Sequence, residues 1–196
     1  MIITIARQYG SGGKKVGELL AERLGYQFYD REVLNMAADS ASIHPEVAER
    51  FDQKPARSLL YNAYMASTNP EEHLPLNQKL ALAEFDAIRS LAEQGNCIFV
   101  GRCADMVLRK RSDLIRVFLH APMDWRIQYA VKNYDVPEPL AEKTIKRTDK
   151  TRAEYYEFFT QRKWGESSNY DLCLNTALLG VEGTVEQLAR FVETIR

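Results

Sequence analysis

Cysteine and histidine are scarce in this chain of 196 residues. The three cysteines, Cys97, Cys103 and Cys173, form no C-x-x-C pair and are odd in number, which favours reduced thiols over a disulfide framework or a zinc site. The three histidines lie far apart and lack the spacing of metal ligands. We therefore interpret Cys97 and Cys173 as strand residues of the core, and we assign the histidines to surface or packing roles.

Long apolar runs and an excess of one charge are absent as well. No stretch approaches the ~20 apolar residues of a membrane span, and the apolar start of the chain is too short for a signal peptide. With 26 basic and 27 acidic residues the net charge is -1, which argues against a broad nucleic-acid-binding surface. These absences predict a cytoplasmic protein, without membrane or nucleic-acid partners, whose anionic ligands are small. They leave the oligomeric state open.

Repeats, low-complexity tracts and obvious linkers are also missing, so the length predicts one domain over residues 1–196 with a substantial core. What is present is an alternation of strand and helix patterns. Strands are predicted over residues 1–6, 26–29, 97–100, 114–119 and 170–176. Helices are predicted over residues 16–24, 123–133 and 140–161 and from Thr184 onward. Such alternation is typical of an α/β fold, here a five-stranded parallel sheet with helices on both faces.

A glycine-rich turn joins the first predicted strand to the first helix. Successive glycines let backbone N–H groups turn toward one anion, and the following helix adds its positive N-terminal end. A lysine beside them neutralises the outer phosphates. The turn consists of Gly10, Ser11, Gly12, Gly13, Lys14 and Lys15. We interpret it as a phosphate site, and the alternative is a glycine-rich connection that binds nothing.

The turn matches the phosphate-binding loop G-x-x-x-x-G-K-[ST] in two registers, neither of them complete. In the first register Lys14 is the motif lysine, Gln8 replaces the first glycine and Lys15 replaces the magnesium-binding hydroxyl. In the second, which we favour and which follows the variant G-x-x-G-x-G-K, Gly13 stands at the lysine position and Arg7 replaces the first glycine. The Ser/Thr ligand of the metal is absent in both, so nucleotide binding is better supported than ordinary P-loop catalysis.

The residues that directly follow the predicted strands form a second group of candidates, because ligands of parallel α/β sheets bind at the carboxyl ends of the strands. Besides the glycine-rich turn they include Asp30, Arg102, Asp105 and Thr176. Asp30 is a candidate ligand, with the cap of the following helix as an equal alternative. Arg102 follows a buried strand and a glycine, which suits bidentate capture of a phosphate. Its alternative is a salt bridge to a neighbouring carboxylate such as Asp105.

The order and spacing of several short segments resemble the cytidylate kinase-like group of P-loop nucleoside monophosphate kinases, over nearly the whole chain. The segments are residues 6–13, 28–30, 101–105, 149–152 with Tyr155, 164–165, 170–172 and 175–176. The resemblance implies a three-layer P-loop NTPase fold. In it, residues 31–94 form a helical acceptor-binding region, and residues from about 140 to 163 form a lid that closes over the transferring group.

The resemblance also implies a role for each candidate residue, with ATP as donor and Mg2+ as the metal. Donor phosphates would be held by Arg7, Gly10, Ser11, Gly12, Gly13, Lys14 and Lys15. The acceptor would be bound by Asp30, Arg102, Asp105 and Asp149. Lys14, Arg147 and Arg152 would act in catalysis by stabilising the charge that develops on the transferring group. The alternative for the lid is a helix with a solvated charged face.

Two departures from the family pattern concern the metal. Val100 stands where such kinases often carry a carboxylate before Gly-Arg, and the loop lacks its hydroxyl ligand. The candidate substitutes are Ser11, Asp30 and Asp105, and the alternative is a metal held mainly by the nucleotide phosphates and water. The metal ligands therefore stay open.

These observations predict an enzyme that transfers the γ-phosphoryl group of ATP to a small phosphorylated acceptor. A nucleoside monophosphate such as CMP is the leading candidate for that acceptor. Two alternatives stay open. One is a non-catalytic nucleotide-binding regulator with a degenerate loop, and the other is a kinase of a non-nucleotide small molecule.

Overall fold

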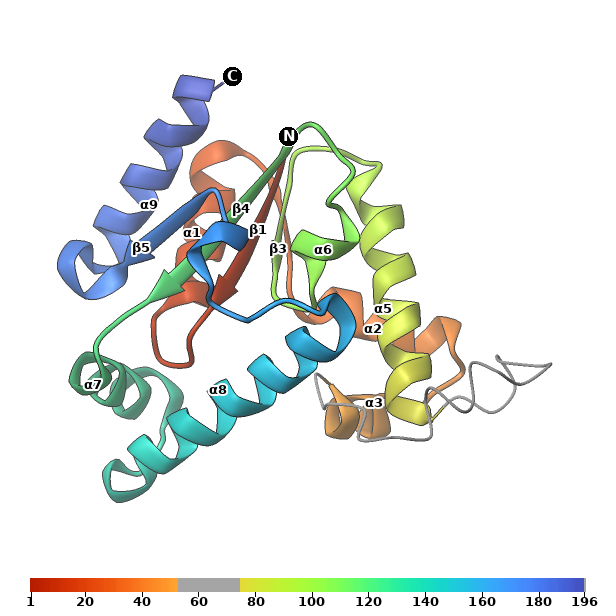
Figure 1. Cartoon of the computed structure of the whole chain (residues 1–196), viewed down its shortest axis with the longest axis horizontal. Helices are drawn as coiled ribbons and strands as arrows, with labels where there is room; N and C mark the ends of the chain where they lie inside the picture. The colour runs from red at the N-terminus through yellow and green to blue at the C-terminus, as the bar shows by residue number, and fades with distance from the viewer. Residues whose placement is uncertain (53–74, 196) are drawn as a thin grey trace.

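Five parallel strands form the centre of the molecule, in the order β2-β3-β1-β4-β5 (Figure 1). The structure is a computed structural model and describes residues 1–52 and 75–195. The strands are β1 (Ile2–Arg7), β2 (Gln27–Tyr29), β3 (Cys97–Val100), β4 (Leu114–His120) and β5 (Leu172–Asn175). Each strand runs parallel to its neighbours, which confirms the predicted parallel sheet.

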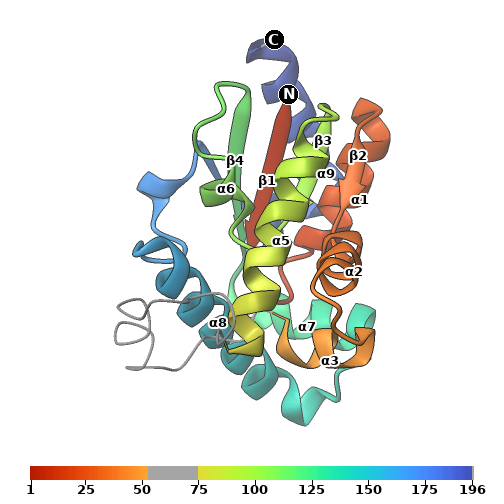
Figure 2. The same ribbon diagram turned by 90° about the vertical axis from the view of Figure 1, so that its right-hand side faces the viewer.

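Helices cover both faces of this sheet (Figures 1 and 2). In the described residues they are α1 (Gly13–Leu24), α2 (Arg31–Ser40), α3 (Pro45–Phe51), α5 (Leu76–Ala92), α6 (Ala104–Val107), α7 (Met123–Tyr134), α8 (Glu138–Thr160) and α9 (Thr176–Ile195). The helices α1 and α9 pack on one face, while α5 and α6 pack on the other. The helices α7 and α8 lie near the carboxyl ends of the strands. The result is the predicted three-layer α/β architecture.

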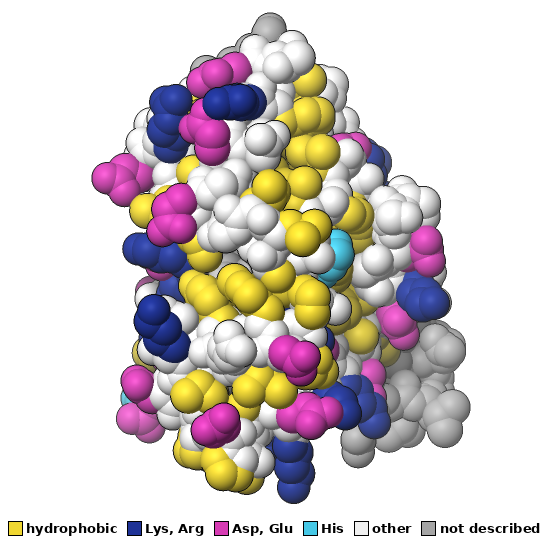
Figure 3. All heavy atoms as spheres, turned by 90° about the vertical axis from the view of Figure 1, so that its left-hand side faces the viewer, with side chains coloured by type: hydrophobic (Ala, Val, Ile, Leu, Met, Phe, Trp, Pro, Cys, Tyr) yellow, Lys and Arg dark blue, Asp and Glu magenta, His cyan; other side chains and the backbone are white. Residues whose placement is uncertain are grey.

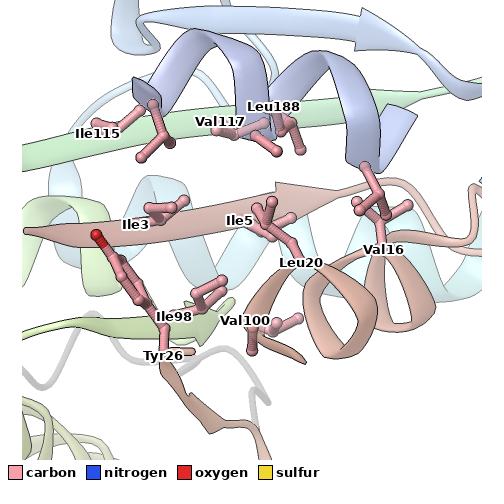
Figure 4. Close-up of a cluster of buried hydrophobic side chains, with 14 of the residues drawn as sticks. Ile3, Ile5, Val16, Leu20, Tyr26, Ile98, Val100, Ile115, Val117 and Leu188 are labelled. Atoms are coloured by element: carbon pink, nitrogen blue, oxygen red, sulfur yellow. The ribbon is translucent and has the colours of Figure 1, made fainter. Parts of the chain in front are cut away.

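One core lies between the sheet and the helices α1 and α9 (Figure 4). Ile3 and Ile5 of β1 point into it, and the register of the sheet places Ile3 beside Ile98 and Ile115. Leu20 of α1 is fully buried in the same cluster. Burying a side chain of this size stabilises the folded state by roughly 1.5–3 kcal/mol. These contacts hold α1, and with it the glycine-rich turn that precedes it, against the sheet.

A second core fills the opposite face of the sheet. Ile2, which alternates with Ile3 along β1, packs with Cys97 and Phe99 of β3 and with Ile88 of α5. All four side chains are buried. Because β1 and β3 are covered on both faces, their sequences are continuous apolar runs without the alternation of a half-exposed strand.

The C-terminal part of the chain differs from the sequence-based prediction in two respects. The helix α9 begins at Thr176 and not at Thr184, and Gly180, with φ 68° and ψ 176°, separates its first turn from the rest. Cys97 is buried, as predicted, but Cys173 is exposed, so its assignment to the core is wrong. The reason is its place on β5, an edge strand, where one set of alternating side chains lacks a covering layer.

Hydrophobic side chains gather on the face of the molecule that is shown in Figure 3, on the side of α9. The exposed large hydrophobic side chains of α9 are Leu178, Leu179 and Ile195. Single exposed leucines are common on globular proteins. Within the described ranges, no helix has the length and apolar content of a membrane span.

The predicted helical region of residues 31–94 contains α2, α3 and α5 in its described part. These helices share a small core in which Leu34 of α2, Ala48 of α3 and Leu80 of α5 are buried. Residues 53–74 of the predicted region, and residue 196, lie outside the described residues. The helices bring Asp30, Asp52 and Glu84 from distant parts of the sequence toward the end of β3, where the candidate site lies.

Candidate active site

A cavity of about 820 Å³ lies at the carboxyl ends of the strands. Several parts of the chain contribute to its wall. The predicted site residues in it are Arg7 at the end of β1, Gly10, Gly13 and Lys14 of the glycine-rich turn, Asp30 and Arg102 beyond the ends of β2 and β3, and Arg152 of α8. The fold therefore brings seven of the predicted site residues to one cavity.

The glycine-rich turn leaves the first turn of α1 open to a ligand. Gly12 occupies the cap position, with φ 74°, and no side chain caps the first N–H groups of the helix. Ser11 is buried, and its hydroxyl donates to the carbonyl oxygen of Gln8 at 2.8 Å. This hydrogen bond of Ser11 stabilises the conformation of the turn. The backbone N–H groups at the start of α1 have no side-chain cap in the described part of the chain.

Arg7, at the end of β1, extends its side chain across two glycines. A Cβ atom on Gly13 would lie 2.6 Å from the Cβ of Arg7, and a Cβ atom on Gly101 would lie 2.1 Å from its Nη1. Real Cβ atoms do not approach other atoms so closely, so both positions need glycine while Arg7 lies here. Burial, and then the charge of Arg152, lower the pKa of Arg7 to about 9.

The guanidinium of Arg152 reaches the same place from α8. Its Nη1 donates to the carbonyl oxygen of Arg7 at 3.1 Å, and its Cζ lies 5.6 Å from the ring centre of Tyr9. Burial lowers the pKa of Arg152, although Asp149 opposes this shift. Like Arg7, it forms no ion pair within the described residues. We call Arg7 and Arg152 the donor-side arginines.

The lysines of α8 and Arg147 are exposed to solvent. Arg147 is exposed and does not line the cavity, so the structure does not bring this predicted catalytic residue to the site. Lys146 pairs with Glu142 at 2.6 Å, and Lys150 pairs with Glu154 at 3.8 Å, both one helical turn apart. The alternative of a solvated charged face therefore describes this side of α8, and Arg152 lies on the other side.

Asp149 connects the loop to α8. One carboxylate oxygen accepts a hydrogen bond from the backbone N–H of Tyr9 at 2.7 Å, and the other pairs with the guanidinium of Arg126 in α7. Both oxygens are thereby engaged, and Asp149 does not line the large cavity. Its place in the structure is that of a link between the loop, α7 and α8.

Arg102 has the opposite environment from the donor-side arginines. Only 3% of its side chain is exposed, and it donates to Glu84 at 2.9 Å, to Asp52 at 2.8 Å and to Asp30 at 3.3 Å. The predicted alternative of a salt bridge is thus realised, but with these three carboxylates and not with Asp105. Sequence reasoning missed Asp52 and Glu84, because they come from α5 and the end of α3 and carry no local motif.

Glu84 is the most deeply buried member of this ion-pair group. Besides Arg102 it accepts a hydrogen bond from the hydroxyl of Tyr155 at 3.1 Å. Burial raises the pKa of Glu84 to about 7, although Arg102 opposes this shift and Asp52 adds to it. Three carboxylates around one guanidinium leave an excess of negative charge, and a raised pKa is one response to that excess.

Asp30 occupies the cap position of α2, as the alternative of a helix cap predicts, but its side chain makes no cap hydrogen bond. It pairs instead with Lys14 at 3.2 Å and with Arg102. Burial raises the pKa of Asp30, but the charges of Arg7, Arg102 and Lys14 lower it below its usual value. Asp30 therefore stays ionised between Lys14 and Arg102.

Asp105 and Thr176, two further predicted residues, lie away from the large cavity. Asp105 is buried behind Arg102, where it lines a separate cavity of about 20 Å³ and accepts a hydrogen bond from the hydroxyl of Tyr156 at 2.7 Å. Burial raises the pKa of Asp105. The hydroxyl of Thr176 donates to the carbonyl oxygen of His120 at 3.2 Å. Both side chains hold neighbouring elements together.

A second cavity, of about 380 Å³, lies between α7 and the kinked start of α9. Trp125 and Tyr129 of α7 stack in its wall, with ring centres 5.0 Å apart and planes inclined by 20°. Lys15, one of the predicted donor-binding residues, lies here as well. Sequence reasoning missed the aromatic pair, although two half-buried aromatic residues four positions apart on one helix were a usable signal.

Comparison with known proteins fits this geometry. The model of the cytidylate kinase-like family matches residues 2–178. The chain belongs to this family. A cytidylate kinase of Natronomonas pharaonis is 26% identical over 185 residues, which cover 93% of this chain and 84% of that protein.

Solved structures share the fold of this cytidylate kinase-like protein. An uncharacterized protein from Eubacterium ventriosum superposes with a TM-score of 0.75 and 28% identity, over 99% of this chain and 98% of that one. A shikimate kinase from Bacteroides thetaiotaomicron superposes with a TM-score of 0.58 and 15% identity, over 98% of each chain. Such low identity to the shikimate kinase shows the fold alone. The chain thus has a kinase-type P-loop fold, as the sequence predicts.

The cavity of this cytidylate kinase-like protein offers two carboxylates to a magnesium ion. No group of three or more His, Cys, Asp or Glu side chains forms a metal site in the part of the chain that is described. Mg2+ in phosphoryl-transfer sites needs only one or two carboxylates beside phosphates and water. Asp30 and Asp52 line the cavity, and Oδ1 of Asp52 is buried without a hydrogen-bond partner among the described residues. The unpaired oxygen of Asp52 beside the carboxylate of Asp30, which now pairs with Lys14 and Arg102, fits Mg2+. Ser11 and Asp105 do not line this cavity.

Proposed function

We propose that this cytidylate kinase-like protein transfers the γ-phosphoryl group of ATP to a small phosphorylated acceptor, with CMP as the leading candidate. The observation that carries the proposal is the division of one cavity into a cationic side and a carboxylate side. Phosphoryl transfer needs positive charge around the phosphates and a group that orients the attacking oxygen. Both lie on the wall of a cavity that is large enough for two small substrates to meet.

The donor ATP would enter with its phosphates on the glycine-rich turn. The free N–H groups at the start of α1 and the side chain of Lys14 face this place. The adenine would lie in the second cavity, against Trp125 and Tyr129, since stacking on an aromatic face is tolerant of the base. Lys15 follows Lys14 in the sequence but lines the second cavity. It would therefore contact the nucleotide between its phosphates and its base.

The acceptor would approach from the side of Asp30 and Arg102. Arg102 would hold the phosphate of the acceptor and align its attacking oxygen with the γ-phosphorus, and Asp30 would accept a hydrogen bond from a hydroxyl or amino group elsewhere on the acceptor. Arg152 would stabilise the charge that develops during transfer, and no covalent intermediate is needed. Asp30 and Asp52 would hold Mg2+, which would supply charge neutralisation of the donor phosphates.

A kinase of a non-nucleotide alcohol is the second candidate, and a specific observation favours it. Arg102 already donates to three carboxylates, so an acceptor phosphate has to displace at least one of them. An alcohol would instead donate its hydroxyl to those carboxylates and leave the ion pairs in place. The shikimate kinases that share the fold, one of them solved with shikimate, act on such a class of acceptor by name.

The test is the production of ADP from Mg-ATP with a panel of nucleoside monophosphates and small alcohols, shikimate included, beside a control without acceptor. Turnover that requires CMP supports the first proposal, and turnover that requires an alcohol supports the second. Clear binding of ATP in calorimetry without turnover on any acceptor supports a nucleotide-binding regulator and contradicts both. The Arg152→Ala variant, measured in parallel, excludes a contaminating kinase as the source of ADP.

A further inference from the structure

The glycine and the cation of the phosphate-binding motif have exchanged places at residues 7 and 13 of this chain. In the register G-x-x-G-x-G-K the first position is glycine and the last is lysine, whereas this chain has Arg7 first and Gly13 last. Each departure alone is unfavourable for phosphate binding. A long side chain at the first position crowds the turn, and a glycine at the last position removes the cation.

The structure joins the two departures into one arrangement. The Cβ and Cγ atoms of Arg7 lie 2.6 Å and 2.8 Å from the place of a Cβ on Gly13, so the aliphatic part of Arg7 occupies the space that a side chain at residue 13 would need. The guanidinium continues past Gly101, whose φ is 80°, into the wall of the large cavity. The two glycines therefore form a passage for one arginine side chain.

The charges nearby leave this guanidinium available to a ligand. Asp30 pairs with Lys14 and Arg102, Asp52 pairs with Arg102, and Asp149 pairs with Arg126, so each neighbouring carboxylate of the described chain has another cation. Arg152 approaches Arg7 as a second positive charge, and the charges of Asp30 and Asp52 offset this only in part, since the pKa of Arg7 stays lowered to about 9. Two buried guanidiniums side by side are favourable only with an anion between or beside them.

Lys14 does not fill the same place. Its side chain is 47% exposed and pairs with Asp30 at 3.2 Å and with Glu18 at 4.0 Å. It therefore points along the surface of α1 toward carboxylates, and its charge is partly neutralised before a ligand binds.

We propose that Arg7 is the cation of the phosphate-binding loop in this protein, and that Gly13 is present to let its side chain pass from the end of β1 into the cavity. This inference rests on the proposed binding of donor phosphates and assigns the residue that neutralises them. Arg7 and Gly13 act as one unit, and restoring the ordinary motif requires the exchange of both.

The exchange itself is the experiment. Binding of ATP is measured by calorimetry for the wild type, Arg7→Gly, Gly13→Lys and the double variant Arg7→Gly/Gly13→Lys. Removal of a buried charged donor raises the Kd for ATP about 10–100-fold in Arg7→Gly. Gly13→Lys alone weakens binding similarly, because its side chain collides with Arg7. The double variant recovers a Kd within about threefold of the wild type, a departure from additivity that two independent sites do not show.

Matched controls separate charge from space and from folding. The double variant Arg7→Gly/Gly13→Met has a side chain of similar length without charge, and it stays as weak as Arg7→Gly. The variant Arg7→Met keeps the side chain in the passage, and denaturant unfolding confirms that each protein tested is folded. Binding of ATP by Arg7→Met at the wild-type Kd overturns the inference, and so does a double exchange as weak as the sum of its single variants.

Tripolyphosphate is the second probe, because its binding does not depend on the base or on any acceptor. Loss of tripolyphosphate binding in Arg7→Met supports the inference even when no acceptor gives turnover, an outcome in which the proposed kinase function fails alone. A wild type that binds neither ATP nor tripolyphosphate overturns the inference and the proposed function together.

Discussion

The two sides of the large cavity hold their arginines in opposite ways. On the donor side, Arg7 and Arg152 approach each other and form no ion pair in residues 1–52 and 75–195, although the charges of Asp30 and Asp52 act on Arg7 from a distance. On the acceptor side, Arg102 is surrounded by Asp30, Asp52 and Glu84. The donor side is thus ready for an anion, whereas the acceptor side is held together by its own charges and must give up an ion pair for every anion that it takes.

The same substitution on each side gives the largest contrast. Arg102→Met leaves Asp52 and Glu84 without their cation and removes one of the two cations of Asp30, and we expect the free energy of unfolding to fall by about 3–5 kcal/mol. Arg7→Met removes a buried charge without a partner, so we expect a change within about 1 kcal/mol, in either direction. Urea unfolding of both variants measures the contrast. Equal losses of stability would contradict the contrast between the two sides, because they would show that Arg7 is paired in solution.

Turnover sharpens the comparison on the donor side. We expect Arg152→Ala to lower kcat about a thousandfold, because the proposed function places its guanidinium at the transferring group, while the Kd for the acceptor changes little. Lys150→Ala is the matched control, since it removes a cation of the same helix that points to solvent. Steady-state kinetics with the acceptor found in the panel measure both. A loss shared equally by the two variants would mean that the net charge of α8, and not the place of Arg152, matters.

The pH dependence of stability reports the acceptor side. Glu84, whose pKa is raised to about 7 from an ordinary 4.5, binds more protons in the folded state than in the unfolded state between these values. Its contribution to stability is therefore present below pH 4.5 and is lost as the pH rises through 7. Relative to Glu84→Gln, we expect the wild type to lose roughly 1–3 kcal/mol of unfolding free energy between pH 5 and 7. Urea titrations of both proteins at pH 5, 6 and 7 measure the difference, and a constant difference would contradict a raised pKa.

Lys14 tests whether an existing ion pair lowers the contribution of a cation to ATP binding, compared with Arg7, which forms no ion pair among the described residues. Because its charge is shared with Asp30 and half exposed to water, we expect Lys14→Ala to raise the Kd for ATP by only about two- to fivefold. Calorimetry on Lys14→Ala and Arg7→Met under identical conditions makes the comparison. A larger effect in Lys14→Ala than in Arg7→Met would return the role of the loop cation to the first register of the motif.

The sequence predicts the sheet well because each inner strand is buried on both faces. The runs of residues 2–6 and 97–100 are apolar throughout, and a residue that follows such a run lies at the carboxyl edge of the sheet. Arg7 and Arg102 were found in this way, whereas Asp30 follows β2, an edge strand without a buried residue. The other edge strand, β5, also lacks double burial, and there the assignment of Cys173 to the core failed.

The ion pairs of the site were beyond the sequence for a different reason. Glu84 lies 18 residues before Arg102, and Asp52 lies 50 residues before it, so only the packing of α3 and α5 brings them together. The path of Arg7 across two glycines is likewise a matter of the angle between β1 and α1. Spacing indicates which element carries a residue, but the partner of its side chain depends on how elements from distant parts of the chain pack.

The bond from the backbone N–H of Tyr9 to Asp149 gives this protein a built-in reporter. The donor of that bond belongs to the segment between β1 and α1 and the acceptor belongs to α8, so the amide is protected only while the helix lies against that segment. Every excursion of α8 away from it exposes this one amide to solvent deuterium. Its exchange rate, followed with and without nucleotide, therefore measures directly how often α8 separates from the segment, at a single atom and without any label.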